Sequence, residues 1–384
     1  MRRGVIGLIA LVAIGATMLQ GGINVEEQAF VTSMGVERME DARLRVSLQI
    51  PVAGMGGGEA GQPSSSGAGG YLLVDSVAHT FQDALERLTS AIPRYLNFSQ
   101  MLQVAVSEAL AREPDFVSVM GSLLSAKNIR QSAIVVVCQG SAHEFVKTQE
   151  ASWGVRLADD IQTSLILFYN QEIIPSMTLG EVIRAQNGAY RDMLLPYSVI
   201  TPLGGDYLAQ PSEMGRPLDT AYHVLTTDVI SHIEYLGAAI FRDGQMIGTL
   251  TGMEMQFISH LQGNPNGFTF YVDGTYYKVR PILPPRISVD TRREQWRFSI
   301  SSNLHASAIH AGGSDMDALR DAFNRETLNV LSKLQALGAD PIGFQGKAVR
   351  SVSTMEAWSR RDWMKAYQNA VIALKTGVME GEAE

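Results

Sequence analysis

The sequence predicts a mixed α/β and α+β protein with more than one domain. The first third of the chain alternates strand-like and helix-like segments, which is typical of α/β units. The last third places a run of strands before one long helix, which is typical of an α+β domain. The chain has 384 residues, 46% of them apolar and 18% charged. A chain of this length is expected to form about two or three domains, and this composition can bury their cores.

The first 22 residues are predicted to be a signal or anchor segment. Arg2 and Arg3 precede an uncharged apolar run over residues 4–23. A basic start followed by an apolar region of about 7–15 residues is typical of a secretory signal peptide. Because a full membrane span needs about 20 apolar residues, an uncleaved anchor is an alternative interpretation. A helix buried in the protein is a third interpretation of this segment.

Residues 23–145 are predicted to form an N-terminal α/β domain. Residues 43–50 alternate apolar and polar side chains, so one face of this strand should be buried and the other exposed. Thr80 and Asp83 resemble a capping box before a helix that ends at Pro93. Further strands are expected at 29–36, from residue 71, at 101–108 and at 132–140.

Two segments of this domain raise the question of chemistry. The continuous apolar run 132–140 predicts a central strand, and it contains the only cysteine, Cys138. A lone cysteine among apolar neighbours is expected to be buried packing rather than a reactive thiol. The Gly/Ser-rich residues 53–70 predict a flexible loop. A phosphate-binding loop is excluded, because no Gly-Lys-Ser/Thr ending follows.

The remainder is predicted to form two further domains. Residues 146–225 are expected to be a smaller middle domain that ends in a linker around 205–220, and residues 226–384 a C-terminal α+β domain. Asp243-Gly244 between two apolar strands predicts a tight hairpin turn. A long helix is expected over 315–337, with Gly338 as its C-cap.

No catalytic, cofactor-binding or metal-binding motif is visible. The formal net charge of -8 argues against a nucleic-acid-binding protein. The seven histidines form no zinc-binding spacing, and neither a nucleophile elbow nor a dinucleotide-binding fingerprint is present. We therefore predict no cofactor and expect an interaction module rather than an enzyme. Trp358 and Trp363 have helical spacing, which fits either a helix packed on a sheet or a partner-binding surface.

Four stretches resemble, in their order and spacing, the Ger(x)C family, the C subunits of nutrient germinant receptors in endospore-forming bacteria. The resemblance covers roughly residues 22–375. The four stretches are residues 26–37 (EEQAFVTSMGVE), 84–113 (ALERLTSAIPRYLNFSQMLQVAVSEALARE), 238–254 (AAIFRDGQMIGTLTGME) and 336–363 (ALGADPIGFQGKAVRSVSTMEAWSRRDW).

This resemblance implies three domains, each a β-sheet wrapped by helices. It also implies a non-enzymatic subunit of a membrane-associated receptor, together with integral membrane subunits of the A and B types, on the outer face of the inner spore membrane. An exported solute-binding protein and a cell-wall hydrolase are the alternative functions. If the chain binds partners, aromatic side chains are the expected contacts. The candidates are Trp358 and Trp363, the turn with Pro93, Tyr95 and Phe98, and the loop 53–70.

The family pattern places a lipid-bearing cysteine where this chain has Gly22. Because glycine has no thiol, no lipid can be attached at that position. Three explanations are open: the apolar segment is retained as an anchor, partner subunits hold the chain, or the start or residue 22 is misassigned. A single acyl chain gives only marginal membrane binding, so a retained apolar helix would replace it adequately.

Overall fold

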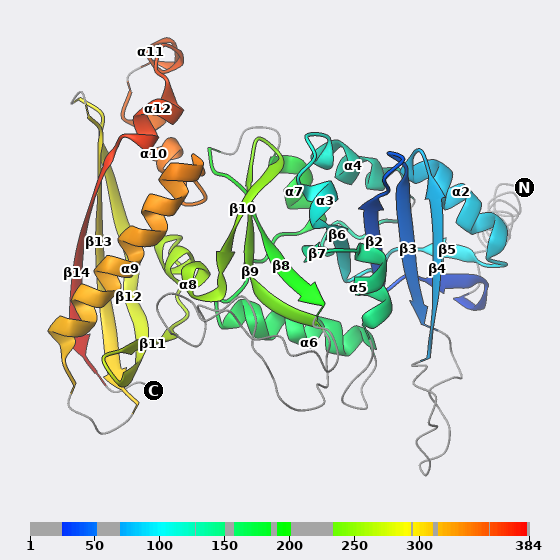
Figure 1. Ribbon diagram of the computed structural model, residues 1–384, viewed down its shortest axis with the longest axis horizontal. Coiled ribbons are helices and arrows are strands. Elements are labelled where there is room, and N and C mark those ends of the chain that lie inside the picture. Colours follow the sequence, from blue (N-terminus) through cyan, green and yellow to red (C-terminus); the bar gives the residue numbers. More distant parts are fainter. Residues whose placement is uncertain are drawn as a thin grey trace, which may run out of the picture.

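The computed structural model describes residues 25–51, 70–126, 128–149, 157–185, 190–200, 233–292, 295–309, 314–352 and 354–381. These ranges form an eight-stranded sheet, a four-stranded sheet and a two-stranded pair, and helices pack on the two larger sheets (Figure 1). The expected mixture of sheets wrapped by helices is confirmed. Gly22 and the N-terminal segment, nearly all of the loop 53–70 and the linker around 205–220 lie outside the described residues.

The large sheet has the order β10-β9-β8-β7-β6-β2-β3-β4. Its four middle strands, β2, β6, β7 and β8, are parallel, and antiparallel pairs extend it at both ends. The bounds are β2 Ser33–Arg38, β3 Leu44–Pro51, β4 Tyr71–Ala78, β6 Gln103–Ser107, β7 Ile134–Gln139, β8 Leu194–Ile200, β9 Ile233–Arg242 and β10 Gln245–Thr251. This single sheet crosses the expected domain boundaries at 145 and 225, so the division into three domains stays a prediction.

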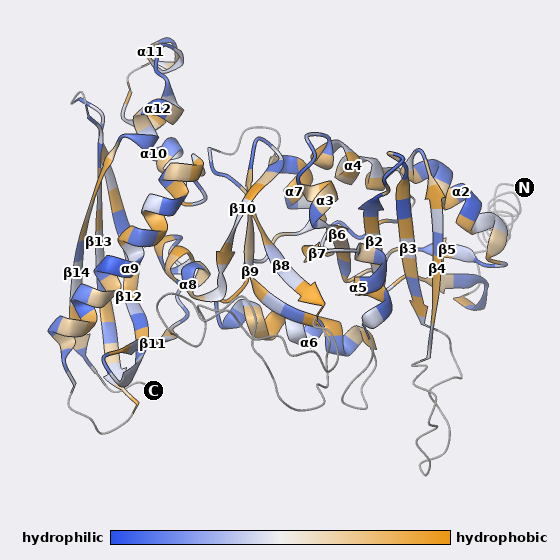
Figure 2. Ribbon diagram, viewed as in Figure 1, coloured by the Kyte–Doolittle hydropathy of each residue, from blue (hydrophilic) through white to orange (hydrophobic). Residues whose placement is uncertain are grey.

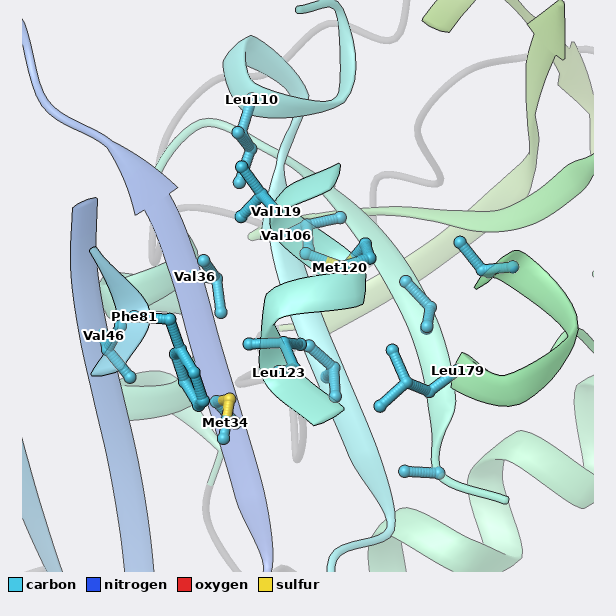
Figure 3. Packing of buried hydrophobic residues seen from close by; sticks show 14 of the residues in the cluster. Met34, Val36, Val46, Phe81, Val106, Leu110, Val119, Met120, Leu123 and Leu179 are labelled. Carbon is cyan, nitrogen blue, oxygen red and sulfur yellow. The ribbon is translucent and has the colours of Figure 1, made fainter. Parts of the chain in front are cut away.

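Helices cover both faces of the large sheet because its central strands are apolar on both sides. In β7, Val135 and Val137 face one core, whereas Val136 and Cys138 face another. Figure 3 shows the first core, where Phe81 and Leu179 from two helices approach the strands. The helices of the first core are α2 Phe81–Ala91, α3 Glu108–Ala111, α4 Phe116–Ser122 and α7 Leu179–Ala185, and those of the second are α5 Ala142–Thr148 and α6 Leu157–Asn170.

The expectation for β3 is only half correct. Its apolar face is buried, as the alternation predicts. Its polar face is buried as well, because α5 packs over it. The Ser47 hydroxyl lies 2.9 Å from His143 Nδ1, and Gln49 Nε2 donates to the carbonyl oxygen of Val146 at 3.1 Å. The buried Ser47 and Gln49 side chains thus each have a hydrogen-bond partner, which explains how this strand lies inside the protein, although Gln49 Oε1 has none among the described residues.

The small sheet has the order β11-β12-β13-β14. Its strands are β11 Phe268–Val272, β12 Thr275–Asp290, β13 Arg297–Ala308 and β14 Val371–Glu380. The helices α8 Gly252–Leu261 and α9 Met316–Leu337 bury an aromatic core against it, in which the Phe257 and Phe323 rings lie 5.3 Å apart. Figure 2 shows hydrophilic and hydrophobic residues alternating along α9, as expected for a helix with one buried face.

Contacts at the ends of α8 and α9 join the two larger sheets. Arg242 Nη1 in β9 donates to the carbonyl oxygen of Leu337 at 2.9 Å, and Lys333 in α9 pairs with Glu254 in α8 at 2.7 Å. The predicted hairpin is confirmed by positive φ angles at Asp243 (52°) and Gly244 (82°). Within the described ranges, no helix combines the length and apolar character needed to cross a bilayer.

Candidate partner-binding surface

Two short helices near the C-terminus position the predicted tryptophans. They are α11 Met355–Ser359 and α12 Trp363–Gln368. Thr354 accepts a hydrogen bond from the backbone N–H of Ala357 at 3.1 Å, and Asp362 accepts one from Lys365 at 3.0 Å. Each cap begins a new helix, so the single helix expected from the spacing of Trp358 and Trp363 is instead two helices with a bend between them.

The bend brings three tryptophans together. The rings of Trp296, Trp358 and Trp363 have centroid separations of 6.0–6.3 Å. Trp363 also stacks on Tyr367 at 5.2 Å, and the Tyr367 hydroxyl donates to the carbonyl oxygen of Ala339 at 2.9 Å. Trp296 is only 6% exposed, whereas Trp358 and Trp363 are half-buried. The two predicted tryptophans thus pack on the sheet and still present an edge at the surface.

The surface around this tryptophan cluster, formed by Trp296, Trp358 and Trp363, combines apolar, cationic and polar groups. The Arg361 guanidinium lies 5.4 Å from the centroid of the Trp296 ring, a cation–π arrangement. Met355 is 60% exposed. An adjacent hollow of about 370 Å³ is lined by Gln295, Trp296, Asp362, Lys365, Ala366 and Asn369. Figure 1 shows α11 and α12 standing out at one end of the four-stranded sheet, where a partner can reach them.

The second predicted contact region lies at the other end of the molecule. Pro93 and Tyr95 are exposed, Tyr95 by 58%. Tyr95 begins β5 Tyr95–Asn97, which pairs in parallel with β1 Gln28–Phe30. Phe98 is only 3% exposed and packs in the first core of the large sheet. Phe98 therefore cannot contact a partner without leaving that core, and we remove it from the candidate surface.

The His, Cys, Asp and Glu side chains of the described residues bear on the sequence predictions for metal and thiol chemistry. Among them, no group of three or more His, Cys, Asp or Glu side chains is arranged to hold a metal ion. Cys138 is fully buried in β7, its thiol donates to the carbonyl oxygen of Val106 at 3.3 Å, and burial raises its pKa. A raised pKa disfavours the reactive thiolate, as expected for a packing residue.

The buried Asp340 and the partly buried Asp192 join the large sheet to α10 Phe344–Arg350, and the sequence offered no motif for them. Asp340 accepts hydrogen bonds from the backbone N–H groups of Gly343 at 2.9 Å, Phe344 at 3.0 Å and Gln345 at 2.7 Å. Its own N–H donates to the carboxylate of Asp192 at 2.7 Å. Burial raises the pKa of both carboxyls, that of Asp192 to about 6. Both groups serve the packing of the chain.

The side-chain carboxyl of Glu172 is buried without a hydrogen-bond partner among the described residues. It lies in the turn after α6, is 1% exposed and has a positive φ of 60°. Neither carboxylate oxygen forms a hydrogen bond, and burial raises its pKa to about 8, although the nearby Ser259 hydroxyl lowers it. Gln256 of α8 donates to the carbonyl oxygen of Gln171, which fixes the turn against α8. At neutral pH this carboxyl is therefore mostly protonated.

Comparison with known proteins identifies the family. Residues 22–200 match the model for the N-terminal domain of spore germination proteins, and residues 236–378 match the model described as spore germination B3/GerAC like, C-terminal. The chain belongs to the Ger(x)C family of spore germination proteins. The two matched ranges together include all of the strands except the first residues of β9 and the last residues of β14, and they include the tryptophan cluster.

Two proteins illustrate how far this family similarity extends. The chain is 20% identical over 366 residues to the putative spore germination protein YfkR of Bacillus subtilis (strain 168). This alignment covers 90% of this chain and 87% of YfkR. The crystal structure of the GerBC protein matches with a TM-score of 0.52 and 14% identity over 91% of this chain and 97% of that chain. At such low identity the structural match supports the fold alone.

Proposed function

We propose that this chain is a non-enzymatic subunit of a membrane-associated germinant receptor and that spores need it for nutrient-triggered germination. The observation that carries this proposal is the match to both Ger(x)C family domains, from residue 22 to residue 378. The partners in this proposal are integral membrane subunits of the A and B types, on the outer face of the inner spore membrane.

In this proposal the tryptophan cluster contacts a membrane subunit. Half-buried tryptophans are suited to this role, because they bring a large apolar area to an interface with few rotatable bonds to immobilise. Met355 extends the apolar area, and Arg361 adds a cation above Trp296. Tyr95 and Pro93, at the other end of the molecule, are a second proposed contact.

Changing the exposed edge of the cluster is expected to weaken binding to the receptor subunits. The variant Met355→Glu places a charge beside the tryptophans without touching the buried rings, and Trp358→Ala removes one ring. We expect either change to reduce co-purification of the A and B subunits about tenfold or more, since interface anchors contribute about 2 kcal/mol or more. The measurement is quantitative co-purification from spore membranes.

Leu167→Glu is the matched control, because it places the same charge at a 49% exposed apolar position on α6, away from the cluster. It should leave co-purification unchanged. Near-ultraviolet circular dichroism reports whether Trp358→Ala preserves the aromatic packing, and Met355→Glu keeps the test valid if it does not. Full co-purification of both variants would exclude the tryptophan cluster from the interface. If Trp358→Ala does not fold, full co-purification of Met355→Glu alone would do so.

A further inference from the structure

The outer face of the four-stranded sheet carries a concentration of positive charge. In β13, Phe298, Ile300, Leu304 and Ala306 are buried in the core with α8 and α9. Successive side chains of a strand point to opposite faces, so the residues between them lie on the other side of the sheet. These residues are Arg297, Ser299, Ser301, Asn303 and His305, and all are exposed or half-exposed.

The strand register places cations from three strands side by side on this face. Ser301 lies between Arg286 of β12 and Lys375 of β14. Four residues earlier along β13, Arg297 lies between Asp290 and Val371. Because adjacent strands are about 4.8 Å apart and each residue adds about 3.3 Å, Arg286 and Lys375 lie about 10 Å apart and Arg297 lies about 13 Å farther along the sheet. We call the area around these three residues the basic face.

This charge is opposite in sign to that of the whole protein. The face also carries Lys278 and Arg280 farther along β12, and Asp290 is its one carboxylate among the described residues. The full chain has a net charge of -8. Arg286, Arg297 and Lys375 are exposed, and within the described ranges none of their side chains forms an ion pair or a hydrogen bond. Their charges add to one local positive potential, which favours an anion between them.

The floor between the cations is made of small and mostly polar side chains. Ser288, Ser299 and Ala373 form one row across the sheet, and Ser301 follows in the next. At Gly377 a Cβ atom would lie 2.7 Å from Asn303 Oδ1, so the Asn303 side chain lies across this glycine. Serine hydroxyls and arginine guanidinium groups both donate hydrogen bonds to carboxylates. The face is therefore chemically complementary to a surface that carries Asp and Glu side chains.

We propose that the basic face binds an acidic surface of a partner protein. The exposed apolar side chains of the outer face are Leu283, which lies opposite Asn303, and Tyr276, Ile309 and Met379, which lie toward the end where β11 pairs with β12. One observation favours a protein over anionic lipid. The described chain begins at the opposite end of the molecule (Figure 1), so an anchor before residue 25 would not by itself bring this face to the bilayer.

The test measures binding of the full chain to a fluorescent poly(L-glutamate) peptide and, separately, to phosphatidylglycerol vesicles. We expect the native chain to bind the peptide, more weakly at higher salt. The triple variant Arg286→Gln, Arg297→Gln, Lys375→Gln should bind it about tenfold more weakly. The control triple variant Arg87→Gln, Arg112→Gln, Lys147→Gln removes the same charge from exposed helix positions and should bind within about twofold of the native chain.

Two results would overturn the proposal. Equal peptide binding by both triple variants would show that net charge, and not the basic face, determines the interaction. Binding to the vesicles but not to the peptide, lost in the basic-face variant, would assign the face to lipid. Neither result depends on the proposed receptor role, because the assay contains no receptor subunit.

Discussion

Replacing Asp340 by alanine is expected to lower the free energy of unfolding by about 3–5 kcal/mol. The Asp340 carboxylate accepts three backbone hydrogen bonds at the start of α10 while only 3% exposed. Alanine would leave these three N–H groups without an acceptor in a site that water barely reaches. The loop that carries Asp340 also hydrogen-bonds to Asp192 just before β8, so the loss would loosen the attachment of α10 to the large sheet.

Chemical denaturation followed by tryptophan fluorescence measures this effect, because three tryptophans lie in the same part of the protein. Asp340→Asn retains one carbonyl acceptor and should have an intermediate stability. Asp321→Ala is the control, since that carboxylate is exposed on α9 and should contribute less than about 1 kcal/mol. Equal stability of Asp340→Ala and the control variant would contradict the assigned role of the Asp340 hydrogen bonds.

Replacing Glu172 by glutamine is expected to stabilise the protein at neutral and alkaline pH. Burial raises the Glu172 pKa from its ordinary value of 4.5 to about 8. The folded state therefore holds a proton that the unfolded state releases. The stabilising contribution of this proton is complete below about pH 4.5, falls as the pH rises, and is lost above about pH 8. By pH 7 the loss amounts to roughly 3 kcal/mol. Glutamine has no proton to lose, so the variant should escape this loss.

The difference in melting temperature between the native chain and Glu172→Gln, measured from pH 4 to pH 9, isolates this group from the other buried acids. Asp192 titrates within the same window, but it does so in both proteins. The difference should be small near pH 4 and should grow until about pH 8. Glu86→Gln on the exposed face of α2 is the control and should show no such trend. If the melting temperatures of the two proteins changed in parallel with pH, or if Glu172→Gln were less stable than the native chain at pH 8, this assignment would be contradicted.

Elements with strong local signals were predictable from the sequence. Thr80 caps α2 by accepting from the Asp83 N–H, Asp243-Gly244 turns between β9 and β10, and Gly338 ends α9 with a φ of 69°. Each feature depends on residues a few positions apart, so backbone preference and capping chemistry decide the outcome.

Features that depend on distant residues were not predictable. β14 pairs in parallel with β13, whose partner residues lie more than 70 positions earlier, and no local pattern marks residues 371–380 as a strand. Trp296 joins Trp358 and Trp363 only because β13 begins beside α12. Phe98 follows an exposed turn in the sequence but points into the core. Asp340 and Asp192 are separated by 148 positions. Tertiary packing alone determines these contacts.

The tryptophan cluster confirms one interpretation of its pattern and leaves the other a proposal. The spacing of Trp358 and Trp363 suggested packing on a sheet or a partner-binding surface. The rings pack against Trp296, and Trp363 also contacts Phe298, yet both predicted tryptophans remain half-exposed. A partner that covered them would bury aromatic surface that the fold already holds rigid, which lowers the entropic cost of binding.

The most direct test of the proposed function is nutrient-triggered germination of spores that lack this chain, measured as the fall in optical density. We expect deletion to abolish the response to the nutrient that this receptor recognises, and the native chain to restore it. Restoration by the native form, with Gly22 unchanged, would also show that a lipid on residue 22 is dispensable. Normal germination of the deletion spores with every nutrient that triggers the parent strain would contradict the proposed role.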